Sequence, residues 1–132
     1  MMHIGLGRQM HTLALMLQVV VALGLLNVWL VRANRNTPYR GGGTHSMAEE
    51  FAAYGLPDWA RVAVGTLKVG AAAALIAGIW MSALVVPAVV LVSVLMLGAL
   101  AMHFKVGDPL RKSVPALIIL VLCAMIWVGT MA

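Results

Sequence analysis

The chain has 132 residues, of which 63% are hydrophobic and only 10% are charged, and its mean hydropathy is +1.00. This composition excludes an ordinary soluble domain and is typical of an integral membrane protein. The formal net charge of +5 does not indicate nucleic-acid binding, because the basic residues are spread over the polar connections and form no single soluble patch.

The first apolar stretch predicts a membrane span over residues 12–32. Residues 1–8 resemble the start of a signal peptide, but the apolar run that follows has full membrane length and no convincing small-residue cleavage site. We therefore expect a retained span. Residues 32–45 form a polar connector that includes three consecutive glycines at 41–43.

Residues 46–55 predict a short amphipathic helix. Ser46 and Glu49 have the spacing of a capping box, in which both side chains satisfy backbone N–H groups of the first turn. Gly55 can adopt the left-handed conformation that ends a helix, and Pro57 cannot continue one. Three side chains spaced i, i+4 and i+7 share one face: Met47, Phe51 and Tyr54. This helix either lies at the membrane interface or folds back against the other helices.

Three further spans are predicted, at residues 59–80, 84–104 and 113–130, and we expect Asp58 to cap the first of these. No charged residue occurs between Val69 and Met102. A helix of that length would measure about 51 Å, which is too long for one crossing of a hydrocarbon core of roughly 30 Å. The run must fold into two spans. The sequence therefore predicts a single all-α domain, residues 1–132, built as a bundle of four transmembrane helices.

The distribution of lysine and arginine predicts the orientation in the membrane. Residues 32–61 and 105–112 carry most of the basic side chains: Arg32, Arg35, Arg40, Arg61, Lys105, Arg111 and Lys112. Only Arg8 lies at the other end. The positive-inside rule then places the connections 32–58 and 105–112 in the cytoplasm and both termini outside. We expect the tryptophans at the two membrane interfaces, Trp29 and Trp59 inside and Trp80 and Trp127 outside.

Six polar or ionisable residues near the membrane belong to the cytoplasmic half and form the candidate site: Asn27, Glu49, Glu50, Asp58, Lys68 and His103. Lys68 is the first functional candidate, because a cation within a span is the most costly placement in the chain. Glu49 and Glu50 are its candidate counter-ions. A structural ion pair and snorkelling of Lys68 toward the loops remain open, as does an interfacial or capping role for His103.

A face of small residues on the second span favours close helix packing, and its members are Gly70, Ala74 and Gly78. Several chemistries are excluded. Haem ligation is not expected, because His11 and His103 lie at opposite membrane faces, and no metal ligands converge. Cys123 is the single cysteine, so the chain has no dithiol of its own. No self-contained catalytic motif is present.

Four segments together resemble the DoxX-like family of small four-span membrane proteins. The match extends over about residues 27–120, and Y-G-L-P followed by a glycine-rich span is its most specific part. The segments are E-E-F-A-A-Y-G-L-P-D-W (49–59), V-G-T-L-K-V-G-A-A-A-A-L-I-A-G (64–78), M-L-G-A-L-A-M-H (96–103) and D-P-L-R-K-S-V-P-A-L (108–117).

The resemblance implies a multi-pass protein of the bacterial inner membrane that is a subunit or accessory of a redox system, linked to a quinone or to thiol or sulfur chemistry. It implies a quinone- or lipid-like pocket near Lys68, His103 and residues 46–55, with quinone as the cofactor to test; whether the chain is itself an enzyme stays open. The first alternative is a scaffold or assembly chaperone for another membrane protein, and the second is a small transporter that dimerises. Expected partners are the bilayer, a membrane or cytoplasmic protein, or a second copy.

Overall fold

A computed structural model describes residues 2–31, 39, 41–44 and 46–131 of the chain. It contains the helices α1 (Met2–Leu26), α2 (Met47–Ala53), α3 (Asp58–Ala77), α4 (Val85–Lys105) and α5 (Val114–Met131). A π-helical turn, η1 (Asn27–Val31), continues α1. Short 3₁₀ turns precede α2, α4 and α5, and these are η2 (Gly41–Gly43), η3 (Ser82–Leu84) and η4 (Leu110–Ser113). Strands are absent from these residues, which confirms the all-α prediction.

Four helical stretches within the described residues are long and apolar enough to cross a membrane: Arg8–Leu30, Asp58–Ala77, Ser82–Lys105 and Leu110–Met131. This confirms the predicted four-span architecture, with α2 as the short helix between the first two spans. The first stretch begins before the predicted start at residue 12. Arg32, Arg35 and Arg40, on which the predicted orientation partly depends, lie outside the described residues.

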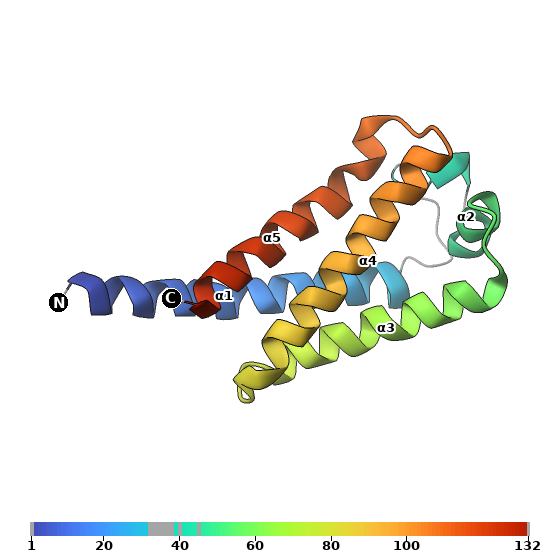
Figure 1. Ribbon diagram of the computed structural model, residues 1–132. Coiled ribbons are helices and arrows are strands. Elements are labelled where there is room, and N and C mark those ends of the chain that lie inside the picture. Colours follow the sequence, from blue (N-terminus) through green and yellow to red (C-terminus); the bar gives the residue numbers. More distant parts are fainter. Residues whose placement is uncertain (1, 32–38, 40, 45, 132) are drawn as a thin grey trace.

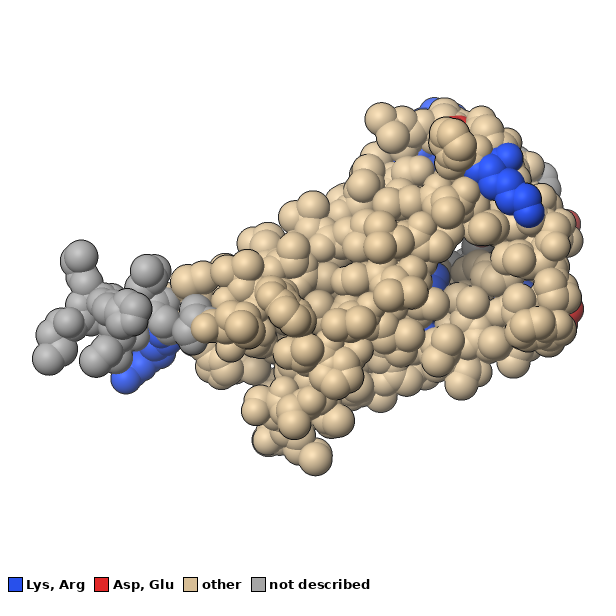
Figure 2. Space-filling model, in the orientation of Figure 1, with Lys and Arg blue, Asp and Glu red and all other residues tan. Residues whose placement is uncertain are grey.

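The four long helices form a ring in which each one contacts two antiparallel neighbours. Helix α1 packs against α3 and α5, and α4 packs against the same two helices. Figure 1 shows that the start of α1, the end of α5 and the turn between α3 and α4 lie at one end of the bundle, whereas α2 lies at the other. Figure 2 shows Lys and Arg atoms at the α2 end and beside the first residues, with a broad uncharged surface between them.

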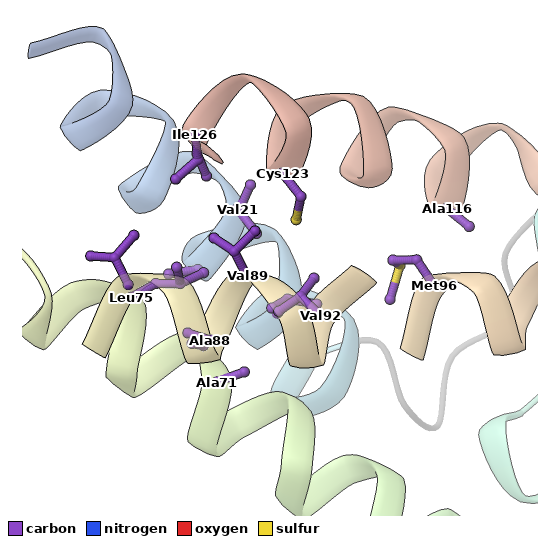
Figure 3. Packing of buried hydrophobic residues seen from close by; sticks show 14 residues of the cluster. Val21, Ala71, Leu75, Ala88, Val89, Val92, Met96, Ala116, Cys123 and Ile126 are labelled. Atoms are coloured by element: carbon purple, nitrogen blue, oxygen red, sulfur yellow. The ribbon is translucent and has the colours of Figure 1, made fainter. Parts of the chain in front are cut away.

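The centre of the ring is filled by small and branched apolar side chains. Ile126 and Cys123 of α5 point toward Val21 of α1 and Val89 of α4 in Figure 3, and all four are buried. Gln18 is the polar exception at this level, since it is only 1% exposed and its Nε2 donates a hydrogen bond to the carbonyl oxygen of Leu75, 3.1 Å away. This bond joins α1 to α3 and satisfies an amide that would otherwise be costly inside a membrane bundle.

Helices α1 and α5 approach each other closely at Gly129. A Cβ atom at this position would lie 2.7 Å from the Cβ of Ala14 and 2.8 Å from the carbonyl oxygen of Met10. Both separations are shorter than a van der Waals contact, so the two helices can meet here only because position 129 has no side chain.

The predicted small-residue face of α3 is buried at Gly78 but becomes exposed toward Gly70. A Cβ at Gly78 would lie 2.6 Å from Cγ2 of Val85, and Ala74 is partly buried against the core. Gly70, in contrast, is exposed and a Cβ there would have no neighbour within 4 Å. The reason is helical geometry, because each step of four residues rotates about 40° beyond a full turn. The three residues therefore do not form one interface within the chain.

Helix α2 is folded back against the bundle. The Ser46 hydroxyl accepts a hydrogen bond of 3.2 Å from the Glu49 N–H, which caps the first turn, and Gly55 ends the segment with φ +77°. The apolar face predicted for this helix is the buried one. Met47 and Phe51 form a second small core with Ala60 of α3 and with partly buried neighbours that are Trp29, Leu56 and Val64.

Candidate functional site

A chain of aromatic rings connects three elements at the α2 end of the bundle. Trp29 of η1 meets Phe51 of α2 edge to face, with ring centroids 6.2 Å apart. Phe51 is followed by Tyr54 at 6.1 Å, and Tyr54 meets His103 of α4 edge to face at 6.2 Å. Such edge-to-face pairs are favourable because the positive edge of one ring faces the negative face of another. The fold-back of α2 thus places its rings between the last turn of the first span and the last turn of the third.

Tyr54 is the centre of the polar contacts in this region. Its hydroxyl donates a hydrogen bond of 2.6 Å to Oε1 of Glu50, and its backbone carbonyl accepts one of 2.7 Å from Nζ of Lys105. Tyr54 and Glu50 are both buried. Gly41 lies directly against the ring, since a Cβ at that position would collide with the Tyr54 hydroxyl. The glycine-rich η2 turn can therefore approach Tyr54 closely.

Asp108, in the connection between α4 and α5, holds together three separate segments. Its Oδ2 accepts a hydrogen bond from Nδ1–H of His103 at 2.7 Å, and both its oxygens accept from the Gly42 N–H at 3.0 and 3.2 Å. Nζ of Lys112 lies 3.7 Å from Oδ1, and the Asp108 side chain is only 6% exposed.

The charge state of Asp108 follows from these contacts. Burial acts to raise the pKa of its carboxyl group, but the hydrogen bonds from His103 and Gly42 and the positive charge of Lys112 outweigh burial, so the pKa is lower than usual. Asp108 is therefore a buried carboxylate with its acceptor sites occupied, and it fixes the Nδ1 proton of His103.

Lys68 lies at the other end of the aromatic chain. Its Nζ is placed over the Trp29 ring, 5.4 Å from the centroid, and the Glu50 carboxylate acts on it electrostatically. Gly65, one turn earlier on α3, makes room for the indole, because a Cβ there would lie 2.6 Å from Cζ3 of Trp29. Among the described residues no hydrogen bond or salt bridge involves Lys68. The negative face of the indole ring is a favourable position for this ammonium group.

The sequence profile of the DoxX-like family matches residues 16–126, which is most of the chain. The chain belongs to the DoxX-like family. An uncharacterised protein of Bacillus subtilis (strain 168), YdgD, is 29% identical over 119 residues, which cover 89% of this chain and 97% of the relative. No solved structure matches. Family membership and the four apolar helices together make this DoxX-like chain a multi-pass membrane protein.

The six residues that the sequence singled out fall into two groups in this DoxX-like chain. Glu50, Lys68 and His103 lie around α2 and are connected through Tyr54 and Trp29. The other three are exposed, and they are Asn27, Glu49 and Asp58.

The capping role predicted for Asp58 is wrong. Helix α3 begins at Asp58 itself, with Pro57 in the capping position and no side-chain cap. The Asp58 carboxylate pairs instead with Nε of Arg61 at 3.0 Å, on the outer surface. Pro57 is extended, so Asp58 lies inside the first turn of α3. The helix dipole still stabilises a carboxylate there, but the side chain does not cap the N–H groups.

Three residues of the site were not predicted as members of it: Trp29, Tyr54 and Asp108. Trp59 and Trp80 are 72% and 78% exposed, whereas Trp29 is partly buried and contacts Phe51 and Lys68. The π-helical turn η1 changes the register of the last residues of the first span, where Trp29 lies. A useful signal was the spacing of Gly65 and Lys68, one turn apart on the facing helix, which leaves space for a large ring.

A separate apolar groove of about 480 Å³ opens between α4 and α5 of this DoxX-like protein. Its lining includes Ser93, Leu97, Cys123 and Trp127. None of the lining residues belongs to the cluster around Lys68 and His103. It is therefore not the quinone- or lipid-like pocket predicted near Lys68, His103 and residues 46–55.

Proposed function

We propose that this DoxX-like protein is a membrane subunit or accessory of a redox system and that it holds a quinone- or lipid-like molecule beside Lys68. The observation that carries the proposal is the position of Lys68, which lies among apolar helices against the Trp29 ring without a hydrogen-bond acceptor in the described part of the chain. An ammonium group within a span is costly, and such residues mark functional sites by default. A head-group oxygen would supply the acceptor.

The surroundings of Lys68 suit an amphiphilic ligand. Phe51 and Trp29 offer apolar ring surface next to the ammonium group, while His103 lies at the far end of the same aromatic chain. Small-molecule sites combine mostly apolar walls with a few placed polar groups in this way. The single buried Cys123 supports an accessory role, because any thiol exchange or electron transfer needs a partner protein or the ligand itself.

The proposed location is a bacterial inner membrane with the α2 end in the cytoplasm. Four described basic residues support this orientation, since they lie at the α2 end of the spans: Arg61, Lys105, Arg111 and Lys112. Arg8 lies at the opposite end, near the start of the first span. An excess of lysine and arginine on one side is the feature that orients multi-span proteins.

Replacing Lys68 with methionine tests the site. The substitution keeps an unbranched side chain of similar length and removes the charge and the donor. Native mass spectrometry of protein released from lipid nanodiscs is expected to show a quinone- or lipid-sized adduct on the wild type and at least about tenfold lower occupancy on Lys68→Met, as expected for the loss of a charged hydrogen bond.

The matched control is Arg61→Met, which removes a cation from the same helix. Arg61 pairs with the exposed Asp58, away from the aromatic chain, so its loss should leave the adduct unchanged. Equal occupancy on wild type and Lys68→Met would exclude Lys68 as the ligand contact. In membranes that hold the redox partner, quinone-dependent turnover should fall with Lys68→Met and not with Arg61→Met.

A second candidate function, a scaffold for another membrane protein, is favoured by two exposed glycines. Gly70 of α3 and Gly98 of α4 lie on the outer surface, and a Cβ at either would have no neighbour within 4 Å. Small residues on a lipid-facing surface allow another helix to approach closely. If the protein is a scaffold, Gly70→Leu should abolish co-purification of a membrane partner while the chain stays folded, and Lys68→Met should not. The reverse result favours the ligand site.

A further inference from the structure

The indole N–H of Trp29 is a buried donor without a partner. Within the described part of the chain, Nε1 of Trp29 is the one buried side-chain nitrogen or oxygen that lacks a hydrogen bond. Native proteins satisfy nearly all such groups, and in a membrane water cannot do so from outside. An unsatisfied N–H at this position therefore calls for an explanation, and a functional role or a bound water or ion is among the usual ones.

The position of the ring shows where this donor points. Gly65 of α3 lies against Cζ3 and Cε3, which belong to the six-membered ring on the side opposite to Nε1. The nitrogen therefore faces away from Gly65. Nζ of Lys68 lies over the face of the same indole. Trp29 thus presents its N–H in the plane of the indole ring, and Lys68 of α3 presents its ammonium group above that plane.

The backbone around Trp29 departs from a regular helix. Trp29 is the middle residue of the π-helical turn η1, at the point where the first span ends. Single π-helical turns cost stability and occur frequently at functional sites. The irregular turn, the unsatisfied indole N–H and the ammonium group over the ring face are three separate observations that meet at Trp29.

We infer that Trp29 and Lys68 together donate hydrogen bonds to one head-group oxygen of a membrane-soluble amphiphile. The inference rests on the proposed function and specifies its ligand: a carbonyl or anionic oxygen at the end of an apolar tail. A quinone carbonyl and a lipid carboxylate or phosphate share this chemistry. The indole nitrogen is buried, so binding requires a local rearrangement that exposes it.

The test uses protein labelled with ¹⁵N at tryptophan and reconstituted in detergent micelles. Decylubiquinone is titrated in one arm and oleate in the other, while the four indole N–H signals are followed by NMR. One signal is expected to shift with the probe, and it should be the signal that is missing from Trp29→Phe. Decylubiquinone alone causing the shift would identify a carbonyl ligand, and oleate alone an anionic one.

Binding constants give the second readout. Trp29→Phe keeps an aromatic ring and removes the N–H, so it should weaken binding of the active probe about five- to tenfold. Trp59→Phe makes the same change at an exposed position and should leave binding unchanged. Thermal unfolding of Trp29→Phe without the probe checks that the variant is folded. The shift of the indole signal is measured on the wild type and does not depend on how the variant folds.

The outcomes separate this inference from the proposed function. Binding by Trp29→Phe within twofold of wild type, or a shift confined to the signals of Trp59, Trp80 or Trp127, would overturn the inference and leave a Lys68 site standing. If Lys68→Met loses binding while Trp29→Phe keeps it, the inference is likewise overturned and the Lys68 site stands. Absence of binding of both probes to the wild type would count against the proposed function as well.

Discussion

Replacing Asp108 with alanine is expected to lower the free energy of unfolding by about 1–3 kcal/mol, the usual cost of leaving hydrogen-bond donors without their acceptor. The carboxylate accepts hydrogen bonds from Gly42 and His103 and faces Lys112, and its side chain is 6% exposed. Without it, the Gly42 N–H and the His103 Nδ1–H lose their acceptor and η2 loses its attachment to the bundle. Thermal or denaturant unfolding in detergent, followed by circular dichroism, measures the loss.

The control is Asp58→Ala, which removes an exposed aspartate from a surface pair with Arg61. Surface pairs of this type contribute little, so the change should stay below about 1 kcal/mol. Equal effects at Asp58 and Asp108 would show that the cluster around Asp108 is not stabilising.

The effect of pH has a defined sign. Because the pKa of Asp108 is lower in the folded chain than its ordinary value of 3.8, its contribution is present above that pH and disappears as the pH falls through the folded pKa. The stability difference between wild type and Asp108→Ala should therefore shrink in acid.

Replacing Gly129 with leucine is expected to destabilise the bundle by about 1–3 kcal/mol or more, as overpacking of a tight contact does. The first atom of any side chain would already lie 2.7 Å from Cβ of Ala14 and 2.8 Å from the Met10 carbonyl oxygen. The carbonyl belongs to the α1 backbone and cannot rotate away, so the two helices must separate. Unfolding of the purified chain in detergent measures the effect.

Gly98→Leu is the matched control, because Gly98 is also a helical glycine but has open space around it. Leucine has the higher helix propensity, so this variant should be as stable as wild type or slightly more stable. If Gly98→Leu destabilises the chain as much as Gly129→Leu, the loss of stability does not come from the contact between α1 and α5.

The sequence predicts the architecture well because long apolar runs have few alternatives in a membrane. The four spans and the buried face of α2, with Met47 and Phe51, follow from length and periodicity. The end of α2 is also predictable, since Gly55 adopts the left-handed conformation expected of it. Each of these features depends on residues that are near one another in the chain.

The site is predicted only in part, because it depends on contacts between distant residues. Lys68, Glu50 and His103 stand out by charge alone, but nothing in their spacing shows that Tyr54 joins Glu50 to His103. Charge alone also selects Glu49 and Asp58, which are exposed. Trp29 is missed for a different reason, since a π-helical turn changes the side that a residue faces without leaving a pattern in the hydropathy.

The length of α1 has a mechanical consequence for the whole assembly. Its 25 residues span about 38 Å, more than the roughly 30 Å of a hydrocarbon core, so the helix must tilt or extend beyond the core. Bilayer thickness acts on that tilt. Because α1 packs against both α3 and α5 and continues into the turn that carries Trp29, we expect a change of tilt to move the indole relative to Lys68. If these two residues bind a ligand as proposed, the thickness of the bilayer would then affect that binding.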